Sequence, residues 1–315
     1  MASKRTTDMS APKSRTTTHR RTIHAGPLLF DVLNHAFLIG AALLCLLPII
    51  NILAVSLSSA SSAAAGEVGL WPVEFTLRSY EYAFTKKLFL TAFGVSLKRV
   101  GLGLAVNLLC TILTAYPLSK TKRELTGRNF YAWFFFVTMI FSGGLIPWYM
   151  VIKQVGLIDS IFALVLPGAV PVFFVLILMN FFRQLPKEIS ESAIVDGAGH
   201  WSILWKIYLP LSLPSLATVS LFTIVGHWNS WFDGLVLMTA PDKYPLQTYL
   251  QGILDVMGPL SFKGLTAEQI RELVKVSGRT LKAAQIFIAA APVLAIYPFL
   301  QKFFMKGLIL GSVKG

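Results

Sequence analysis

The chain has 315 residues, of which 55% are hydrophobic and 14% charged, and its formal net charge is +13 at pH 7. Soluble globular domains carry about 25% charged residues, so the composition excludes an ordinary soluble domain and favours an integral membrane protein. Cys45 and Cys110 both lie in apolar runs, which excludes a disulfide framework and offers no spacing of metal ligands.

Residues 1–27 form a basic tail. Six Lys or Arg residues fall within the first 21, among Thr and Ser, and no apolar period accompanies them. We predict a disordered cytoplasmic tail that can touch anionic lipid, not a nucleic-acid-binding segment. The apolar run 36–57 exceeds the core of a cleaved signal peptide, which has about 7–15 residues. The sequence therefore favours a retained first span over a cleaved signal.

Six membrane spans are predicted from apolar runs, because a bilayer core needs about 20 apolar residues per helix. Their approximate ranges are 32–57, 97–118, 129–152, 160–182, 211–239 and 283–306. The predicted fold class is an all-α integral membrane protein. Spans three, four and six contain Gly or Pro, as in SGGLIP and LPGAVP. Such breaks either kink helices for packing or line a pathway.

The segments between the spans predict an orientation. With the N-terminus inside, the inner segments hold 16 of the 28 Lys and Arg residues, so both termini are expected in the cytoplasm. The outer segment 58–90 is too polar to span, and its aromatic residues suit the membrane interface. A capping box, Thr266 with Gln269, predicts a short surface helix before span six.

The inner loop 183–210 has an unusual local pattern. Pro186 can open a helix, Glu188 and Glu191 lie in its first turns, and Asp196-Gly197 is typical of a turn. A second amphipathic helix is expected to follow, with an apolar face made by Trp201, Leu204, Trp205 and Tyr208. The pattern predicts a docking element on the cytoplasmic surface; the alternative is an ordinary amphipathic loop.

Within this loop, ESAIVDGA at 191–198 and IYLP at 207–210 resemble the signature cytoplasmic loop of ABC-importer permeases. Ser192 stands where that family usually has alanine. The matching residues, which the resemblance makes ATPase-coupling residues together with Glu188, are Glu191, Ala193, Asp196, Gly197, Ala198, Ile207, Leu209 and Pro210.

The resemblance implies a type I ABC-importer permease fold over residues 28–315, with a core at about 90–306. It implies a homologous partner permease in a heterodimer, an ATPase dimer that uses ATP and Mg²⁺, and an extracytoplasmic solute-binding protein. The chain itself would be non-catalytic and bind no cofactor. It contains no G-x-x-x-x-G-K-[ST] phosphate loop of its own.

Two further segments resemble the carbohydrate branch of this family. HWNSWFDGLVLM in span five is similar to a segment of maltose-type permeases, and the C-terminal YPFLQKFFMKGLILGSVKG is similar to the ending of the second permease in oligosaccharide systems. The C-terminal resemblance places four residues near the ATPase: Gly307, Gly311, Lys314 and Gly315.

Span five also offers candidates for the substrate path. Aromatic rings and an amide suit a sugar, and an intramembrane acid is a functional candidate. The candidates are Trp228, Asn229, Trp231 and Asp233. Helix packing is the alternative role for the Trp and Asn residues, and a position near the outer interface is the alternative for Asp233. For the whole chain, the competing functions are an ion-driven secondary transporter and a membrane-embedded enzyme.

Overall fold

The structure is a computed structural model that describes residues 25–256 and 278–312, and the described residues form helices and loops without any strand. This confirms the all-α prediction. The long helices are α1 (Ala25–Ser56), α4 (Lys87–Ser119), α5 (Arg128–Ile140), α7 (Val172–Gln184), α11 (Leu213–Asn229) and α15 (Gly278–Ser312). The shorter elements are α2 (Ala60–Ala65), α3 (Arg78–Thr85), α6 (Leu145–Gln154), η1 (Ile161–Leu164), η2 (Leu166–Gly168), α8 (Lys187–Val195), α9 (His200–Ile203), η3 (Leu204–Tyr208), α10 (Leu209–Leu211), α12 (Phe232–Leu237), η4 (Pro241–Lys243) and α13 (Leu246–Val256).

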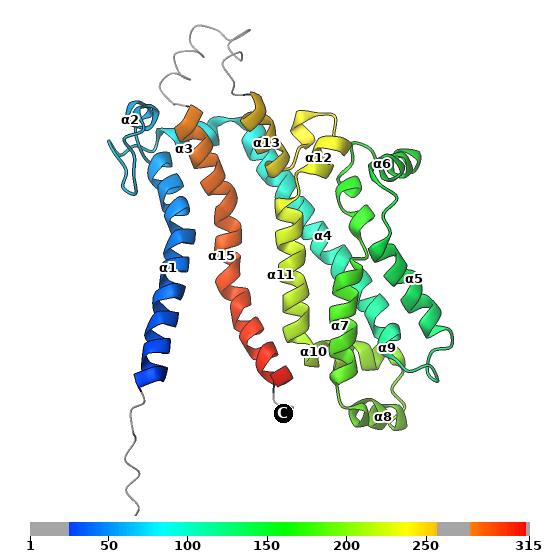
Figure 1. Ribbon diagram of the computed structural model, residues 1–315. Helices are drawn as coiled ribbons and strands as arrows, with labels where there is room; N and C mark the ends of the chain where they lie inside the picture. Colours follow the sequence, from blue (N-terminus) through cyan, green and yellow to red (C-terminus); the bar gives the residue numbers. More distant parts are fainter. Residues whose placement is uncertain (1–24, 257–277, 313–315) are drawn as a thin grey trace, which may run out of the picture. The chain divides into compact units, whose positions relative to one another are not determined.

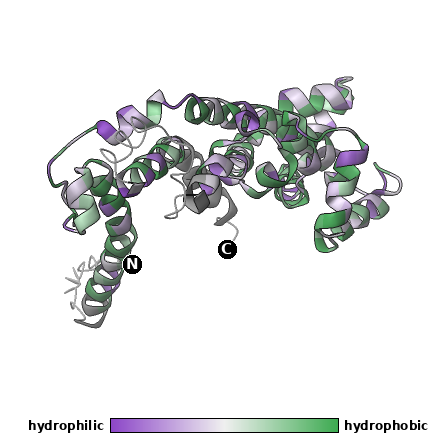
Figure 2. Ribbon diagram, turned by 90° about the horizontal axis from the view of Figure 1, so that it is seen from above, coloured by the Kyte–Doolittle hydropathy of each residue, from purple (hydrophilic) through white to green (hydrophobic). Residues whose placement is uncertain are grey.

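The chain divides into two units, Met1–Ile49 and Ile50–Gly315; we call the second the core unit. In the first unit, Phe30, Phe37 and Leu44 of α1 are all more than two-thirds exposed. Hydrophobic residues recur along the long helices of the chain (Figure 2). Apolar side chains that are exposed along a helix of this length suit contact with lipid.

Within the part of the chain that the structure describes, three segments are long and apolar enough to cross a membrane: Phe30–Ser56, Lys87–Ser119 and Gly278–Ile296. Three bent helix pairs raise the number to six if each pair is one span. The bends are 115° between α5 and α6, 49° between the η1–η2 segment and α7, and 81° between the segment 200–211 and α11. The expected fifth span, 211–239, is interrupted because α11 ends at Asn229 and α12 begins at Phe232.

The sharpest bend follows from the sequence SGGLIP. Gly144 has φ +84°, a conformation that glycine adopts readily and other residues avoid. Pro147 lies in the first turn of α6, where the missing backbone N–H of proline leaves no helical hydrogen bond unmade. The same residues that predicted an interrupted third span thus set the direction in which α6 leaves α5.

Helix α4 packs against both α7 and α11 in the core unit (Figure 1). Its buried positions include small and polar residues, among them Ser96, Gly103 and Asn107. A Cβ atom at Gly103 would overlap the imidazole ring of His227 on α11. Small residues allow membrane helices to approach closely, so Gly103 fixes the separation of α4 and α11 at this level.

The segment 58–90 forms α2, α3 and loops, and contains no span, as its polarity predicts. Trp71, Phe75 and Phe84 are at least half exposed, whereas the Tyr80 hydroxyl hydrogen-bonds the Ser56 hydroxyl at 2.7 Å. The surface helix expected around Thr266 lies outside the described residues.

A bridge between Asp159 and Lys243 links the loop after α6 to η4. The Lys243 Nζ lies 2.5 Å from the Asp159 carboxylate, and the Thr239 N–H donates to the same carboxylate at 3.0 Å. These bonds lower the pKa of Asp159 from 3.8 to about 2. The folded chain therefore holds this carboxylate ionised at a pH where the unfolded chain protonates it.

The stability that this bridge contributes decreases as the pH falls. A lowered carboxyl pKa stabilises the fold above the unfolded pKa, and the contribution disappears as the pH falls from about 4 to 2. We expect the thermal unfolding midpoint of the wild-type chain to fall more between pH 5 and pH 2 than that of Asp159→Asn, with equal slopes between pH 7 and pH 5. Equal slopes across the acid range would contradict this role of the bridge.

Candidate functional site

The turn that ends α8 is a Schellman motif. Gly197 has φ +83°; its N–H donates to the Ile194 carbonyl at 3.0 Å, and the Ala198 N–H donates to the Ala193 carbonyl at 2.9 Å. These are the two hydrogen bonds of the motif, which requires a residue in the left-handed conformation just past the helix end. Glycine at position 197 is thus needed by the backbone, whatever the loop binds.

The residues of the signature loop separate by burial into two groups. The apolar members pack against the cluster formed where α4, α7 and η3 meet; they are Ala193, Ala198, Ile207 and Leu209. The three acids and the proline are exposed: Glu188, Glu191, Asp196 and Pro210. Beside the acids, the Val195 side chain is 87% exposed. The loop is therefore anchored by its small and aliphatic residues and presents a surface of acids with an apolar side chain.

Three basic residues tie this loop and the adjoining helix ends together. Lys120 donates to the Tyr208 hydroxyl at 3.2 Å and lies 4.6 Å from the Tyr208 ring centroid. The side chains of Arg128, at the start of α5, and Arg183, near the end of α7, both donate to the Leu118 carbonyl at 3.0 Å. Carbonyls in the last turn of a helix lack intrahelical donors, so α4, α5 and α7 share one capping site.

The second helix of the loop differs from the expected one. It begins as α9 and continues as the π-helical η3, so its faces do not follow a 3.6-residue period. Leu204 and Tyr208 are buried, whereas Trp201 and Trp205 are 65% and 49% exposed. The expected single apolar face of four residues is therefore wrong: one pair packs into the core and the tryptophans face outward.

The candidates of the substrate path lie around the break between α11 and α12. Trp228 is 3% exposed; its Nε1 donates to the Ala289 carbonyl at 2.8 Å, and its ring packs edge-on against Phe93. This environment matches helix packing. Asn229 and Trp231 are exposed.

Asn229 and Trp231 line a cavity of about 350 Å³ together with Gln247 and Gln251 of α13 and apolar residues of α15. The two glutamines are four residues apart on one helix and hence lie on one face. The structure thus brings two of the four candidates together with two amides that the sequence analysis did not single out.

Asp233 forms an ion pair with Arg99 of α4. The two Arg99 terminal nitrogens contact both carboxylate oxygens of Asp233, and one of them also donates to the Ser230 carbonyl at 3.1 Å. The Ser230 hydroxyl and the Gly234 N–H donate to Asp233 as well. Arg99 thereby holds together the broken ends of α11 and α12. An arginine within the expected second span, 97–118, was the available signal for this partner.

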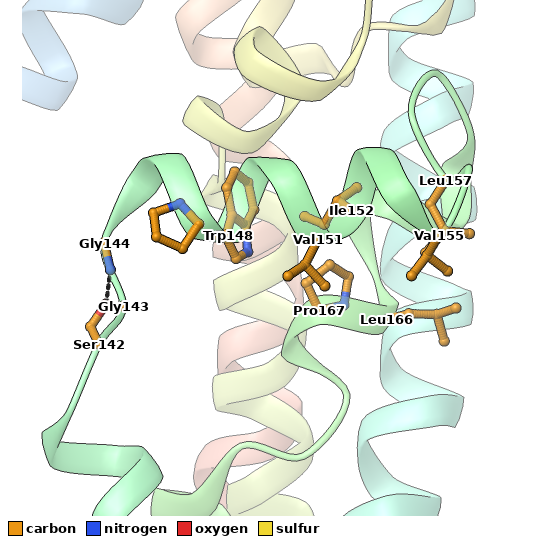
Figure 3. A pocket seen from close by; sticks show the side chains of 11 residues that line it. Ser142, Gly143, Gly144, Trp148, Val151, Ile152, Val155, Leu157, Leu166 and Pro167 are labelled. Atoms are coloured by element: carbon orange, nitrogen blue, oxygen red, sulfur yellow. Dashed lines mark hydrogen bonds between the residues drawn. The ribbon is translucent and has the colours of Figure 1, made fainter.

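A larger, mostly apolar cavity of about 600 Å³ lies where α6 faces η2. Figure 3 shows Trp148 and Val151 of α6, and Val155 just after it, above Leu166 and Pro167, with the Gly144 N–H bonded to the Ser142 hydroxyl. It offers few polar groups to a sugar.

Metal-binding groups and the C-terminal candidate residues are the remaining features. No group of three metal-binding side chains occurs among residues 25–256 and 278–312. Gly307 and Gly311 belong to the last turns of α15, whereas Lys314 and Gly315 lie outside the described residues.

Comparisons with known proteins cover most of the chain. The sequence model of the family described as "Binding-protein-dependent transport system inner membrane component" matches residues 127–309. Protein LplC of Bacillus subtilis is 41% identical over 286 residues, which span 91% of this chain and 95% of LplC. The polygalacturonan/rhamnogalacturonan transport system permease protein YtcP of the same organism is 39% identical over 91% of this chain and 99% of its own length.

A solved structure agrees with these relatives. One chain of a bacterial ABC transporter involved in the import of the acidic polysaccharide alginate superimposes with a TM-score of 0.82 and 31% identity, covering 89% of this chain and 98% of that one. The chain therefore belongs to the family of binding-protein-dependent transport system inner membrane components and is an ABC-importer permease whose relatives include permeases of sugar-transport systems.

Proposed function

We propose that the chain is the permease subunit of an ATP-driven importer of oligosaccharides. It pairs with a homologous permease, receives substrate from an extracytoplasmic solute-binding protein, and couples to an ATPase dimer that binds ATP and Mg²⁺. The observation that carries the coupling role is the 188–210 loop, because its acids are exposed while its apolar residues pack in the cluster formed where α4, α7 and η3 meet.

The docking surface has the chemistry for a basic partner. Glu188, Glu191 and Asp196 are exposed on α8 and its C-terminal turn, and exposed acids pair with Lys or Arg groups across an interface. The C-terminal end of α15 lies toward the same end of the core unit as α8 (Figure 1), which supports the expected position of Gly307 and Gly311 near the ATPase. Both termini are then cytoplasmic and the chain crosses the bacterial cell membrane several times.

The names of the relatives support the proposed substrate class. Their names include polygalacturonan/rhamnogalacturonan, arabinooligosaccharide and maltodextrin transport systems, and one structural neighbour imports alginate. Oligosaccharides of plant or algal polysaccharides are the class common to these. The exposed Asn229 and Trp231 beside Gln247 and Gln251 supply the amides and the flat ring that a sugar requires.

The test is a mild-detergent purification of the tagged full chain from its native membranes, with mass spectrometry of the proteins that accompany it. We expect a second permease and an ATPase with the wild type, and a reduced yield of ATPase, but not of permease, with Glu191→Ala. Ser192→Ala, which restores the usual family residue beside Glu191, is the matched control and should retain the ATPase. A chain that is recovered alone, with uptake that survives ATP depletion, would favour a secondary transporter.

A further inference from the structure

We propose that a cavity with one polar wall, within the core unit, binds one sugar ring of the transported oligosaccharide, so that this chain itself contributes a substrate subsite; the inference rests on the proposed function. The cavity has a volume of about 360 Å³, within the range of small-molecule sites, which are about 300–1,000 Å³. Its polar wall is made by Arg99, Asn107, Thr223, His227, Ser230 and Asp233.

The cavity lies where the broken helices converge. Trp148 comes from α6, beyond the 115° bend; Pro167 and Gly168 come from η2, before the 49° bend; Ser230 and Asp233 border the break between α11 and α12. Irregular backbone at membrane depth is tolerated where it is buried in protein or lines a cavity, and discontinuous helices form the substrate sites of many transporters. Three independent interruptions meeting at this one cavity are more than helix packing requires.

Buried polar atoms without partners gather at the same place. Arg99 Nε, Asn107 Oδ1, Thr223 Oγ1 and His227 Nε2 are buried and have no hydrogen-bond partner among the described residues. They are four of eight such side-chain atoms in the described part of the chain, and all four residues line this one cavity. A buried polar group without a partner is unfavourable, so these groups are expected to serve a polar ligand.

The chemistry of these atoms favours hydroxyl groups over an ion. Arg99 Nε is a donor, Asn107 Oδ1 is an acceptor, and the Thr223 hydroxyl can be both. The guanidinium charge is already balanced by Asp233, so a carboxylate would have to compete for it. Sugar hydroxyls donate and accept at once and need no net charge in the site. The Trp148 ring adds a flat apolar wall for the C–H face of the sugar ring.

The test uses native-membrane vesicles that contain the complete importer and three labelled probes: trigalacturonate, arabinotriose and maltotriose. For a probe that the wild type transports, we expect Thr223→Val and Asn107→Leu to raise KM about three- to tenfold each, with the maximal rate nearly unchanged. Because Thr223→Val removes an unpartnered buried hydroxyl and conserves shape, its unfolding midpoint should be unchanged or higher. A residue with a purely structural role would not weaken sugar uptake while leaving stability intact.

Thr111→Val is the matched control. Thr111 is buried on α4, its hydroxyl has no partner among the described residues either, and it is not part of the cavity wall, so its KM should equal that of the wild type. Unchanged KM in both cavity variants, or an equal rise in Thr111→Val, would mean that the cavity holds only water and would overturn the subsite alone. Failure of the wild type to transport any probe would remove the proposed oligosaccharide function, and the subsite with it.

Discussion

Replacing Gly197 with valine is expected to lower ATP-driven uptake at least tenfold without reducing the amount of chain in the membrane. Gly197 has φ +83°, and an L-residue in the left-handed region costs roughly 1–2 kcal/mol, more when it is β-branched. About 1.4 kcal/mol is a tenfold change in an equilibrium, so the closed turn would be disfavoured about tenfold relative to the wild type. Glu191 lies on α8 and Asp196 is the residue that ends it. The two acids would then lose their fixed arrangement.

Gly199 provides the matched control for this prediction. Both glycines have open space where a Cβ would be added, but Gly199 has φ −74° and ψ 161°, a conformation that valine adopts readily. Gly199→Val should therefore retain most of the uptake. The measurements are vesicle uptake, ATPase activity of the purified importer and immunoblotting of the membranes. Similar losses in the two variants would show that side-chain bulk, and not the backbone conformation at Gly197, disturbs the loop.

The second large effect is expected at the ion pair between α4 and the α11–α12 break. Asp233→Ala leaves the Arg99 guanidinium, whose side chain is 3% exposed, without its carboxylate. Breaking a buried pair on one side costs about 3–5 kcal/mol because a buried charge is left uncompensated. We expect the thermal unfolding midpoint of the purified chain in detergent to fall well below that of the wild type.

A double variant separates the unpaired charge from the packing of the site. Arg99→Met with Asp233→Leu removes both charges and keeps most of the volume, so it should be more stable than Asp233→Ala, since buried pairs can be exchanged for apolar residues at little cost. Lys243→Ala, which breaks the more exposed bridge to Asp159, should change the midpoint far less. If the double variant is the least stable of the three, the ion pair contributes more than compensation of the Arg99 charge.

The parts of the fold that depend on short stretches of sequence were predictable. Apolar runs located the helices, SGGLIP located the sharpest bend, and Asp196-Gly197 located a turn because glycine there satisfies a backbone requirement. The long-range pairings were not predictable in the same way. Arg99 and Asp233 are 134 positions apart, and no local pattern indicates that α4 faces the end of α11.

The candidate site was predictable to a similar degree. Motif spacing identified the signature loop, but sequence periodicity could not identify which residues anchor it. The π-helical η3 shifts the register after Ile203, and both Trp201 and Trp205 face outward although a regular helix would place them on one face with Leu204. Among the substrate-path candidates, residue type singled out both Trp228 and Trp231. Only the structure separates them, because Trp228 is packed in the core and Trp231 is exposed.

The shared cap at the Leu118 carbonyl has a mechanical consequence. Two arginines from different helices donate to a single oxygen, and Lys120 adds a connection to η3, so side-chain hydrogen bonds join the ends of α4, α5 and α7 at this cap. Under the proposed coupling, a partner that displaces α8 is expected to move these joined helix ends together. We expect the core unit to bend at its interruptions, at Gly144, before α7 and after Asn229, so that a displacement of the loop rotates the segments beyond those breaks.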